Sequence, residues 1–195
     1  VTTAAALDVI RRAKDKGLNV TCGTAPHYFA LNELELATYR TFAKVSPPLR
    51  SEDDRRAVVD AIRDGTIDVI SSGHMPQDQE AKRLPLEQAA FGAVGLETML
   101  AVGLQLHKTE GVPILDIIRC MTEAPAKLLG LESGTLAKGA PADLVVFDMD
   151  APWIVDAKKF RSKSKNSPFD GRPLEGHAVR TVVDGRTVFV RRVEN

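Results

Sequence analysis

Apolar residues in the first half of the chain recur at two spacings, one typical of helices and one of strands. Residues 4–16 carry apolar side chains three and four positions apart, and Gly17 ends the pattern. The short run 18–22 (LNVTC) then predicts a strand. A second helical pattern spans 51–65, and 67–72 (IDVISS) predicts a second strand with an apolar core. The order helix, strand, helix, strand is typical of βα units around a parallel sheet.

Two further apolar helices are predicted after these units, and then the pattern changes. Residues 94–108 form one helix, and 114–130 form another that is bent or broken at Pro125. Beyond Gly130, short alternating strands are separated by Gly, Pro and Asp. The run 182–190 predicts a hairpin, since Asp-Gly between β-branched residues favours a type I′ turn. We therefore predict an α/β fold with two parts, residues 1–130 and a β part at 131–195.

The composition is that of an ordinary globular protein and excludes several classes of partner. Of 195 residues, 44% are hydrophobic and 27% charged, and 26 basic residues balance 26 acidic ones. This balance predicts neither a nucleic-acid nor an acidic-membrane partner. Apolar runs stay below the ~20 residues of a membrane span, and the two cysteines form no disulfide framework, so we expect a cytoplasmic protein. The basic run 158–165 (KKFRSKSK) is interpreted as a solvated loop. The opening at Val1, on a helix cap without a preceding strand, suggests a fragment.

Two of the four histidines follow predicted strands and are the main candidates for chemistry. His27 and His74 fall where α/β enzymes place their sites, at the carboxyl ends of strands. His107 lies in a helix and His177 leads into a strand, so both are interpreted as structural. A lone histidine after a strand is more often a packing residue than a ligand.

The carboxylates needed to complete a metal site are poorly placed. Catalytic zinc usually takes three protein ligands, and the two histidines supply at most two. Asp68 begins its strand, at the opposite end, and Asp78 lies beyond Pro76. Neither a G-x-S-x-G nucleophile motif nor a Gly-rich phosphate loop is found, and Cys22 is interpreted as a small core residue. The residues alone predict an α/β scaffold with an incomplete polar mouth.

Five stretches, taken together and in order, resemble the later half of dihydroorotases of the amidohydrolase superfamily. Allantoinases and hydantoinases share parts of the pattern, and SPPLRSEDDR favours dihydroorotase. The resemblance covers essentially the whole chain. The stretches are TAPHYFAL (24–31), KVSPPLRSEDDRRAVVDAIRDGTIDVISSGHMP (44–76), FGAVGLETML (91–100), KGAPADLVVFD (138–148) and SKSKNSPFDGRPLEGHAVRTVVDGRTVF (162–189).

The resemblance implies a (β/α)8 barrel carrying a small β-sandwich domain built from both chain ends. This chain would then supply the last βα units of the barrel and part of the sandwich. Active members hold one or two zinc ions at the barrel mouth, and a metal-bound hydroxide attacks the cyclic amide of dihydroorotate, with carbamoyl aspartate as the open form. The resemblance therefore implies a cyclic amidohydrolase of pyrimidine biosynthesis.

Compared with the family pattern, however, the candidate site is degenerate. His27 falls at a metal-ligand histidine and is kept. Gly73 stands where the family has its catalytic aspartate, and Gln77 replaces a substrate-contacting histidine. Ser46 replaces an asparagine before PPLR, and Gly23 stands where glutamate is common. We expect no catalytic residue in this chain, no confident substrate contact at Ser46 or Gln77, and zinc absent or weakly bound at a vestigial His27.

Three readings follow from the resemblance. The first is a non-catalytic homologue that partners aspartate carbamoyltransferase. The second is an active zinc dihydroorotase, or a related cyclic amidohydrolase, of which only the C-terminal half is given. The third is a different cyclic-amide or imine hydrolase in which Asp78 supplies the carboxylate. In each, we expect the N-terminal half of the same protein or a homo-oligomer to cover the open side of the half barrel.

Overall fold

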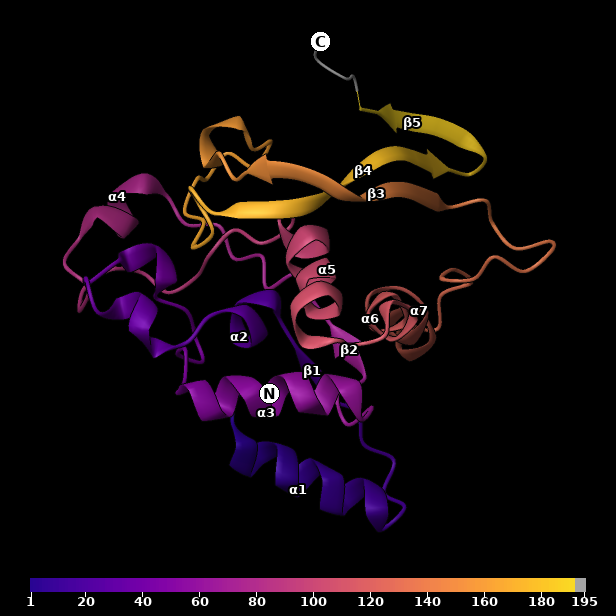
Figure 1. The fold of residues 1–195 in the computed structure, drawn as a ribbon, viewed down its shortest axis with the longest axis horizontal. Helices are drawn as coiled ribbons and strands as arrows, with labels where there is room; N and C mark the ends of the chain where they lie inside the picture. Colours follow the sequence, from indigo (N-terminus) through magenta and orange to yellow (C-terminus); the bar gives the residue numbers. More distant parts are fainter. Residues whose placement is uncertain (192–195) are drawn as a thin grey trace.

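The computed structural model describes residues 1–191 and contains two small sheets among seven α-helices (Figure 1). Short 3₁₀ turns lie at Glu33–Leu36, Thr41–Ala43 and Ala157–Lys159. In chain order the helices and strands are α1 (Ala4–Asp15), β1 (Gly23–Thr24), α2 (Pro26–Ala30), α3 (Glu52–Arg63), β2 (Val69–Ile70), α4 (Gln79–Arg83), α5 (Met99–Glu110), α6 (Ile114–Met121), α7 (Glu123–Leu129), β3 (Leu144–Ile154), β4 (Pro173–Val183) and β5 (Arg186–Val190).

The first sheet places three loops at one edge. Strands β1 and β2 are parallel, with Thr24 opposite Ile70. A parallel bridge joins His74 to Ala93, so the segment before α5 runs beside the loop that follows β2. Since the carboxyl ends of parallel strands meet at one edge, the loops after β1, after β2 and after Ala93 lie together there. The predicted α/β architecture of βα units is confirmed.

The two N-terminal helices form where the sequence predicts them, because each has a side-chain cap and an apolar face. The Thr3 hydroxyl accepts a hydrogen bond from the Ala6 N–H (3.3 Å) at the start of α1. The Ser51 hydroxyl accepts one from the Asp54 N–H (3.3 Å) at the start of α3. Helix α1 buries Leu7, and α3 buries its face against α1 and α2. The fully buried core includes Phe29, Val58, Val59, Ile62, Ile67, Ile70, Val102 and Ile117.

Several predicted element boundaries are wrong, among them that of the strand expected at 67–72, which is limited to Val69–Ile70. The strand expected at 18–22 falls instead at Gly23–Thr24, because the parallel pairing with β2 begins only there. The Cys22 carbonyl accepts from the N–H groups of Asp68 and Val69, so backbone contact with the second strand starts at the last residue of the predicted run. Helix α5 begins at Met99 rather than at 94, since the chain is held extended where the Val94 N–H donates to the Asn166 carbonyl (3.1 Å).

The break expected at Pro125 occurs three residues earlier. Helices α6 and α7 are separated at Thr122, whose φ and ψ of −129° and −77° are not helical. Pro125 lies in the first turn of α7. A proline is tolerated there because the first N–H groups of a helix have no partner within it.

The predicted C-terminal β part is a three-stranded antiparallel sheet in the order β3–β4–β5. Asp184 and Gly185, both at positive φ (48° and 70°), form the predicted turn between β4 and β5. Strand β4 packs on α5, and the segment 155–172 turns back beside the barrel part (Figure 1). The division of the chain at residue 130 stays a prediction.

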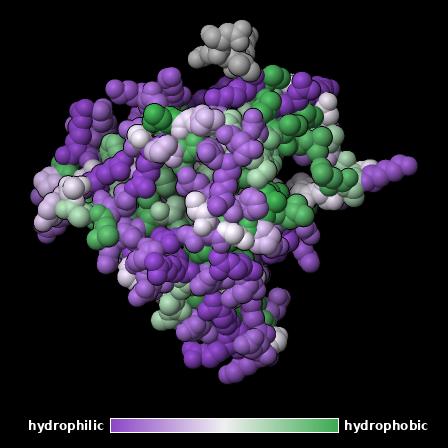
Figure 2. Space-filling view, in the orientation of Figure 1, coloured by the Kyte–Doolittle hydropathy of each residue, from purple (hydrophilic) through white to green (hydrophobic). Residues whose placement is uncertain are grey.

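The surface over this sheet is more apolar than the surface over the N-terminal helices. Figure 2 shows hydrophobic residues gathered over the outer end of β3, β4 and β5, and mostly hydrophilic residues over α1. Val146, Val188 and Val190 are each more than half exposed. No helix within residues 1–191 is long and apolar enough to cross a bilayer.

Candidate functional site

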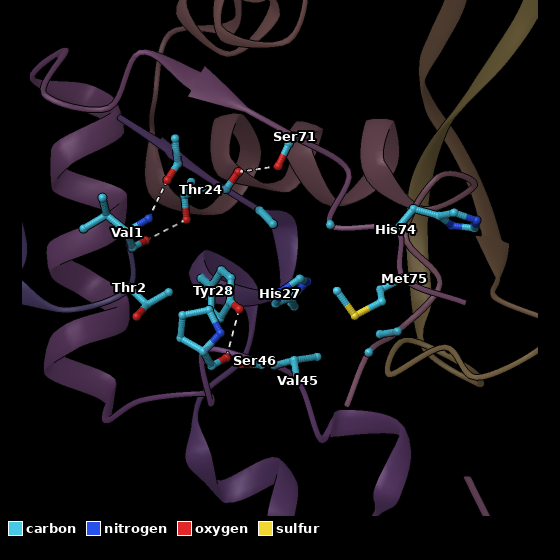
Figure 3. Close-up of a pocket in the computed structure, with 16 residues that line it drawn as sticks. Val1, Thr2, Thr24, His27, Tyr28, Val45, Ser46, Ser71, His74 and Met75 are labelled. Carbon is cyan, nitrogen blue, oxygen red and sulfur yellow. Dashed lines mark hydrogen bonds between the residues drawn. The ribbon is translucent and has the colours of Figure 1, made fainter. Parts of the chain in front are cut away.

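A cavity of about 330 Å³ opens where the loops after β1 and β2 meet (Figure 3). It is the position at which α/β barrels carry their active sites. No Asp or Glu among residues 1–191 lines it. Its polar side chains are Thr2, Thr24, His27, Tyr28, Ser46, Ser71 and His74.

His27 reaches this cavity because α2 begins directly after β1. The side chain is buried, with only 6% of the residue exposed, and its ring packs edge-on against Tyr28 at 4.1 Å between centroids. Burial lowers the pKa of His27 from 6.5 to about 4. The imidazole is therefore neutral at pH 7, which is the form that can bind a metal or accept a proton.

The ring of His27 occupies the space that any side chain at position 73 would need. A Cβ built on Gly73 would lie 2.5 Å from His27 Cε1 and 2.9 Å from the Ala25 Cβ. Gly73 also has a φ of +59°, which side-chain-bearing residues rarely adopt. Two separate features therefore favour glycine at position 73: the positive φ of its backbone and the closeness of the His27 ring.

His74 lies at the same edge but points away from His27 (Figure 3). Its Nδ1 accepts hydrogen bonds from the N–H groups of Gly95 (3.2 Å) and Leu96 (3.4 Å). These bonds tie the loop after β2 to the segment before α5. The two histidines thus lie at the predicted edge, and His74 has the structural role that a lone histidine usually has.

The two altered family positions Ser46 and Gln77 are not brought together. Ser46 lines the cavity, beside Pro47, whose carbonyl accepts from the Tyr28 hydroxyl (2.9 Å). Gln77 does not line it; its N–H donates to Asn166 Oδ1 (3.3 Å), and the residue lines a neighbouring cavity. The altered substrate contacts expected at Ser46 and Gln77 stay predictions.

The two carboxylates considered from the sequence serve other purposes. Asp78 caps α4 by accepting from the Ala81 N–H (2.7 Å) and does not line the cavity. Asp68 lies at the opposite end of β2, where it pairs with Lys14 (2.8 Å) and accepts from the Cys22 N–H. Neither can supply a base to His27.

Sequence reasoning missed two residues that shape the mouth. Tyr28 walls the cavity, and burial raises its pKa to about 12, so it stays a neutral donor. Its position next to His27 after a strand could have indicated it. Asn166 is buried and joins two mouth loops, donating from Nδ2 to the Gly92 carbonyl (3.1 Å) while accepting from Gln77. No local pattern could indicate Asn166, because its partners lie more than 70 residues away.

Residues 1–191 do not form a zinc site by themselves. Within residues 1–191 there is no group of three or more His, Cys, Asp or Glu side chains that could hold a metal ion. His27 offers one nitrogen ligand. Two hydroxyls beside it already donate hydrogen bonds to backbone carbonyls, Thr24 to Val1 (3.1 Å) and Ser71 to Thr24 (3.3 Å). Zinc requires three anionic or imidazole ligands. The metal-ligand role of His27 stays a prediction.

The buried neutral His27 makes stability depend on pH in a defined window. Because its pKa is about 4 when folded and 6.5 when exposed, the unfolded chain binds the extra proton first. The contribution of His27 to the free energy of unfolding is therefore fully present above pH 6.5. It is lost as the pH drops toward 4, by up to about 3 kcal/mol. Urea unfolding of the protein and of His27→Asn at pH 7 and pH 4.5 measures this. Equal pH dependence in both proteins would contradict it.

Comparison with known proteins places this geometry in one family. Residues 2–188 match the Amidohydrolase family. The chain is 46% identical over 189 residues to the dihydroorotase of Anaplasma phagocytophilum (strain HZ), covering 97% of this chain and 42% of that protein. It is 46% identical over 192 residues to the dihydroorotase of Wolbachia sp. subsp. Drosophila simulans (strain wRi), covering 98% and 44%.

Solved structures agree on the fold. The L-hydantoinase of Arthrobacter aurescens superposes with a TM-score of 0.90 at 34% identity, covering 96% of this chain and 43% of that one. The dihydropyrimidinase of Brevibacillus agri NCHU1002 gives 0.89 at 24% identity, which shows the fold alone. The chain spans less than half the length of these relatives, and its fold is that of the C-terminal part of their barrels. With a sequence match over 2–188 and this superposition, the chain belongs to the amidohydrolase family.

Proposed function

We propose that this chain is the C-terminal part of a dihydroorotase-type protein of pyrimidine biosynthesis whose mouth no longer hydrolyses cyclic amides. The observation that carries the proposal is the packing of His27 into the space beside Gly73. In the family pattern, position 73 carries an aspartate whose carboxylate would bind the metal and take up the proton. The structure has an imidazole there, and no acid of residues 1–191 lines the cavity.

The energetic consequence of this change is large. Losing a positioned general base lowers a rate by about two to four orders of magnitude. Losing a metal ligand as well removes the means of making hydroxide near pH 7. Together the two losses are expected to bring turnover down to the background rate.

The alternative function is an active zinc dihydroorotase or related cyclic amidohydrolase, with metal ligands contributed by the remainder of the protein. The identity of 46% to two dihydroorotases and the presence of His27 favour it. It requires a carboxylate from outside residues 1–191 to reach the cavity, because none of the described acids lines it. A reshaped loop using Asp78 would first have to uncap α4.

Metal content and turnover of the purified full-length protein, which includes the part that would contribute further ligands, distinguish the two functions. We expect less than about 0.1 zinc per chain after dialysis against micromolar zinc, and no cyclisation of carbamoyl aspartate above the buffer rate. The dihydroorotase of Anaplasma phagocytophilum, purified and assayed identically, is the matched control. One zinc or more per chain together with ordinary turnover would refute the proposal and establish the alternative.

We also propose that the protein assembles with aspartate carbamoyltransferase, a role that rests on the resemblance to dihydroorotases. The apolar surface that includes Val146, Val188 and Val190 is expected to be covered by the rest of the protein or by a second copy. Mixing the protein with aspartate carbamoyltransferase of the same organism should give one co-eluting peak in size-exclusion chromatography. Separate elution at concentrations of about 10 µM would refute the proposed assembly without bearing on catalysis.

A further inference from the structure

A second cavity, of about 410 Å³, lies beside the candidate site and is lined by an unusual number of cations. It is formed between α4 and the segment that follows β3, which turns back on the α4 side of the molecule (Figure 1). Four of its ten lining residues are basic and one, Asp78, is acidic. The basic residues are Lys82, Arg83, Lys163 and Lys165.

Part of the basic run 158–165 therefore faces a cavity and is not simply a solvated loop. Its Lys163 and Lys165 come to lie beside α4, about 80 residues earlier in the chain, because Asn166 is fastened to the Gly92 carbonyl and the Gln77 N–H. The fold thus gathers positive charge from two segments that the sequence keeps apart.

The positive charges at this cavity have little counter-charge. Within residues 1–191 only Arg83 has a carboxylate partner, Glu80, and that pair is exposed to solvent. Lys82 is 2% exposed, and its Nζ donates to the carbonyls of Ala90 (2.7 Å), Thr41 (2.9 Å) and Lys44 (3.3 Å), which uses all three of its N–H bonds. Carbonyl oxygens fix the ammonium but do not neutralise it, so the wall of the cavity stays cationic.

Two more features define what such a cavity would bind. Lys165 lines the cavity, and its Nζ donates to the carbonyls of Phe160 (2.6 Å) and Ser162 (2.8 Å), which fix the position of its charge and leave one N–H for a ligand. Phe42 adds an aromatic face, and Gln77 adds an amide. The volume lies in the range of small-molecule sites, whereas a bare surface patch would have no enclosed volume.

We propose that this cavity is a binding site for a small phosphorylated ligand. The phosphate would be contacted by Arg83, Lys163 and Lys165 and attracted by the buried charge of Lys82, with the body of the ligand against Phe42. A phosphate carries close to two negative charges and three acceptor oxygens, which matches several cations better than a single carboxylate does. The site is separate from the cavity of His27 and does not depend on whether that cavity is catalytic.

Calorimetric titration of the purified protein with inorganic pyrophosphate at low ionic strength tests the proposal. We expect saturable binding of one pyrophosphate per chain, weakened at least about tenfold by the double substitution Arg83→Ala/Lys163→Ala. Both side chains are exposed, so the variant should remain folded. The matched control is Lys158→Ala/Lys159→Ala, which also removes two positive charges but from residues of the basic run that do not line the cavity.

The outcomes separate a built site from general attraction. Unchanged affinity in the control, within about twofold, together with the loss in Arg83→Ala/Lys163→Ala supports the site. Non-saturable heats, or equal weakening in the two double variants, overturn it. Succinate, which carries two carboxylates, should bind at least about tenfold more weakly than pyrophosphate; equal binding would overturn the assignment to phosphate.

Discussion

Replacing Gly73 by aspartate is expected to destabilise the protein by roughly 2–5 kcal/mol and to leave it without bound zinc. The substitution would formally restore the family's carboxylate. A residue with a side chain at φ +59° costs about 1–2 kcal/mol. Overpacking the buried His27 and Ala25, which an added Cβ would approach to 2.5 and 2.9 Å, costs about 1–3 kcal/mol more. Urea unfolding and metal analysis of the purified variant measure both effects.

Gly65→Asp is the matched control for this substitution. Gly65 has a φ of +78° and no atom within 4 Å of an added Cβ, so it carries the backbone cost without the clash. We expect it to lose only about 1–2 kcal/mol. The double variant His27→Ala/Gly73→Asp should lose less unfolding free energy than the two single variants lose in total. Removing the ring makes room for the carboxylate. Equal losses in Gly73→Asp and Gly65→Asp, or zinc binding by Gly73→Asp, would contradict the packing argument.

Replacing Arg55 by methionine is expected to cost about 3 kcal/mol, while the same change at Arg56 should cost less than about 0.5 kcal/mol. The Arg55 side chain is 14% exposed and pairs with Glu52 (2.8 Å) and Glu110 (3.1 Å). It also donates to the Phe29 carbonyl (2.8 Å), which holds α2 and therefore His27 in place. Arg56 is 68% exposed and forms an ion pair with Glu52 (3.2 Å) at the surface. Denaturant unfolding of the two variants tests the difference.

The pKa of Glu52 gives a second measurement that does not depend on global stability. Hydrogen bonds from Arg55 first, and then from Asn32, lower this pKa from 4.5 to about 2. In Arg55→Met it should rise toward 4.5, and in Arg56→Met it should stay near 2, as followed by NMR titration of the carboxyl carbon. Similar pKa values in both variants would show that the two neighbouring arginines are equivalent.

Much of the local structure could be predicted from the sequence because short-range interactions determine it. The caps at Thr3 and Ser51 act within three residues of themselves, and apolar spacing indicates which helix face is buried. The Asp184–Gly185 turn is equally local, since its two residues alone supply the positive φ angles. The position of His27 and His74 at one edge followed from strand order, because parallel strands end together.

Contacts between distant residues decided where the strands begin and end. They also decided which side chains lie together at the cavity of His27. The sheet pairs β1 with β2 across 46 positions, so no local pattern could show that pairing starts at Gly23 rather than at residue 18. Similarly, nothing near Gly73 in the sequence indicates that the ring of His27 fills its side-chain space.

The sequence by itself determined the family resemblance, the helices, the hairpin and the absence of a carboxylate at position 73, because each is a matter of residue identity or of neighbours a few positions apart. The tertiary structure alone decided that Arg55 is buried and Arg56 is not, that Asn166 joins two mouth loops, and that Lys82 and Lys163 share a cavity. These depend on how segments far apart in the sequence pack together, and packing is a property of the whole fold.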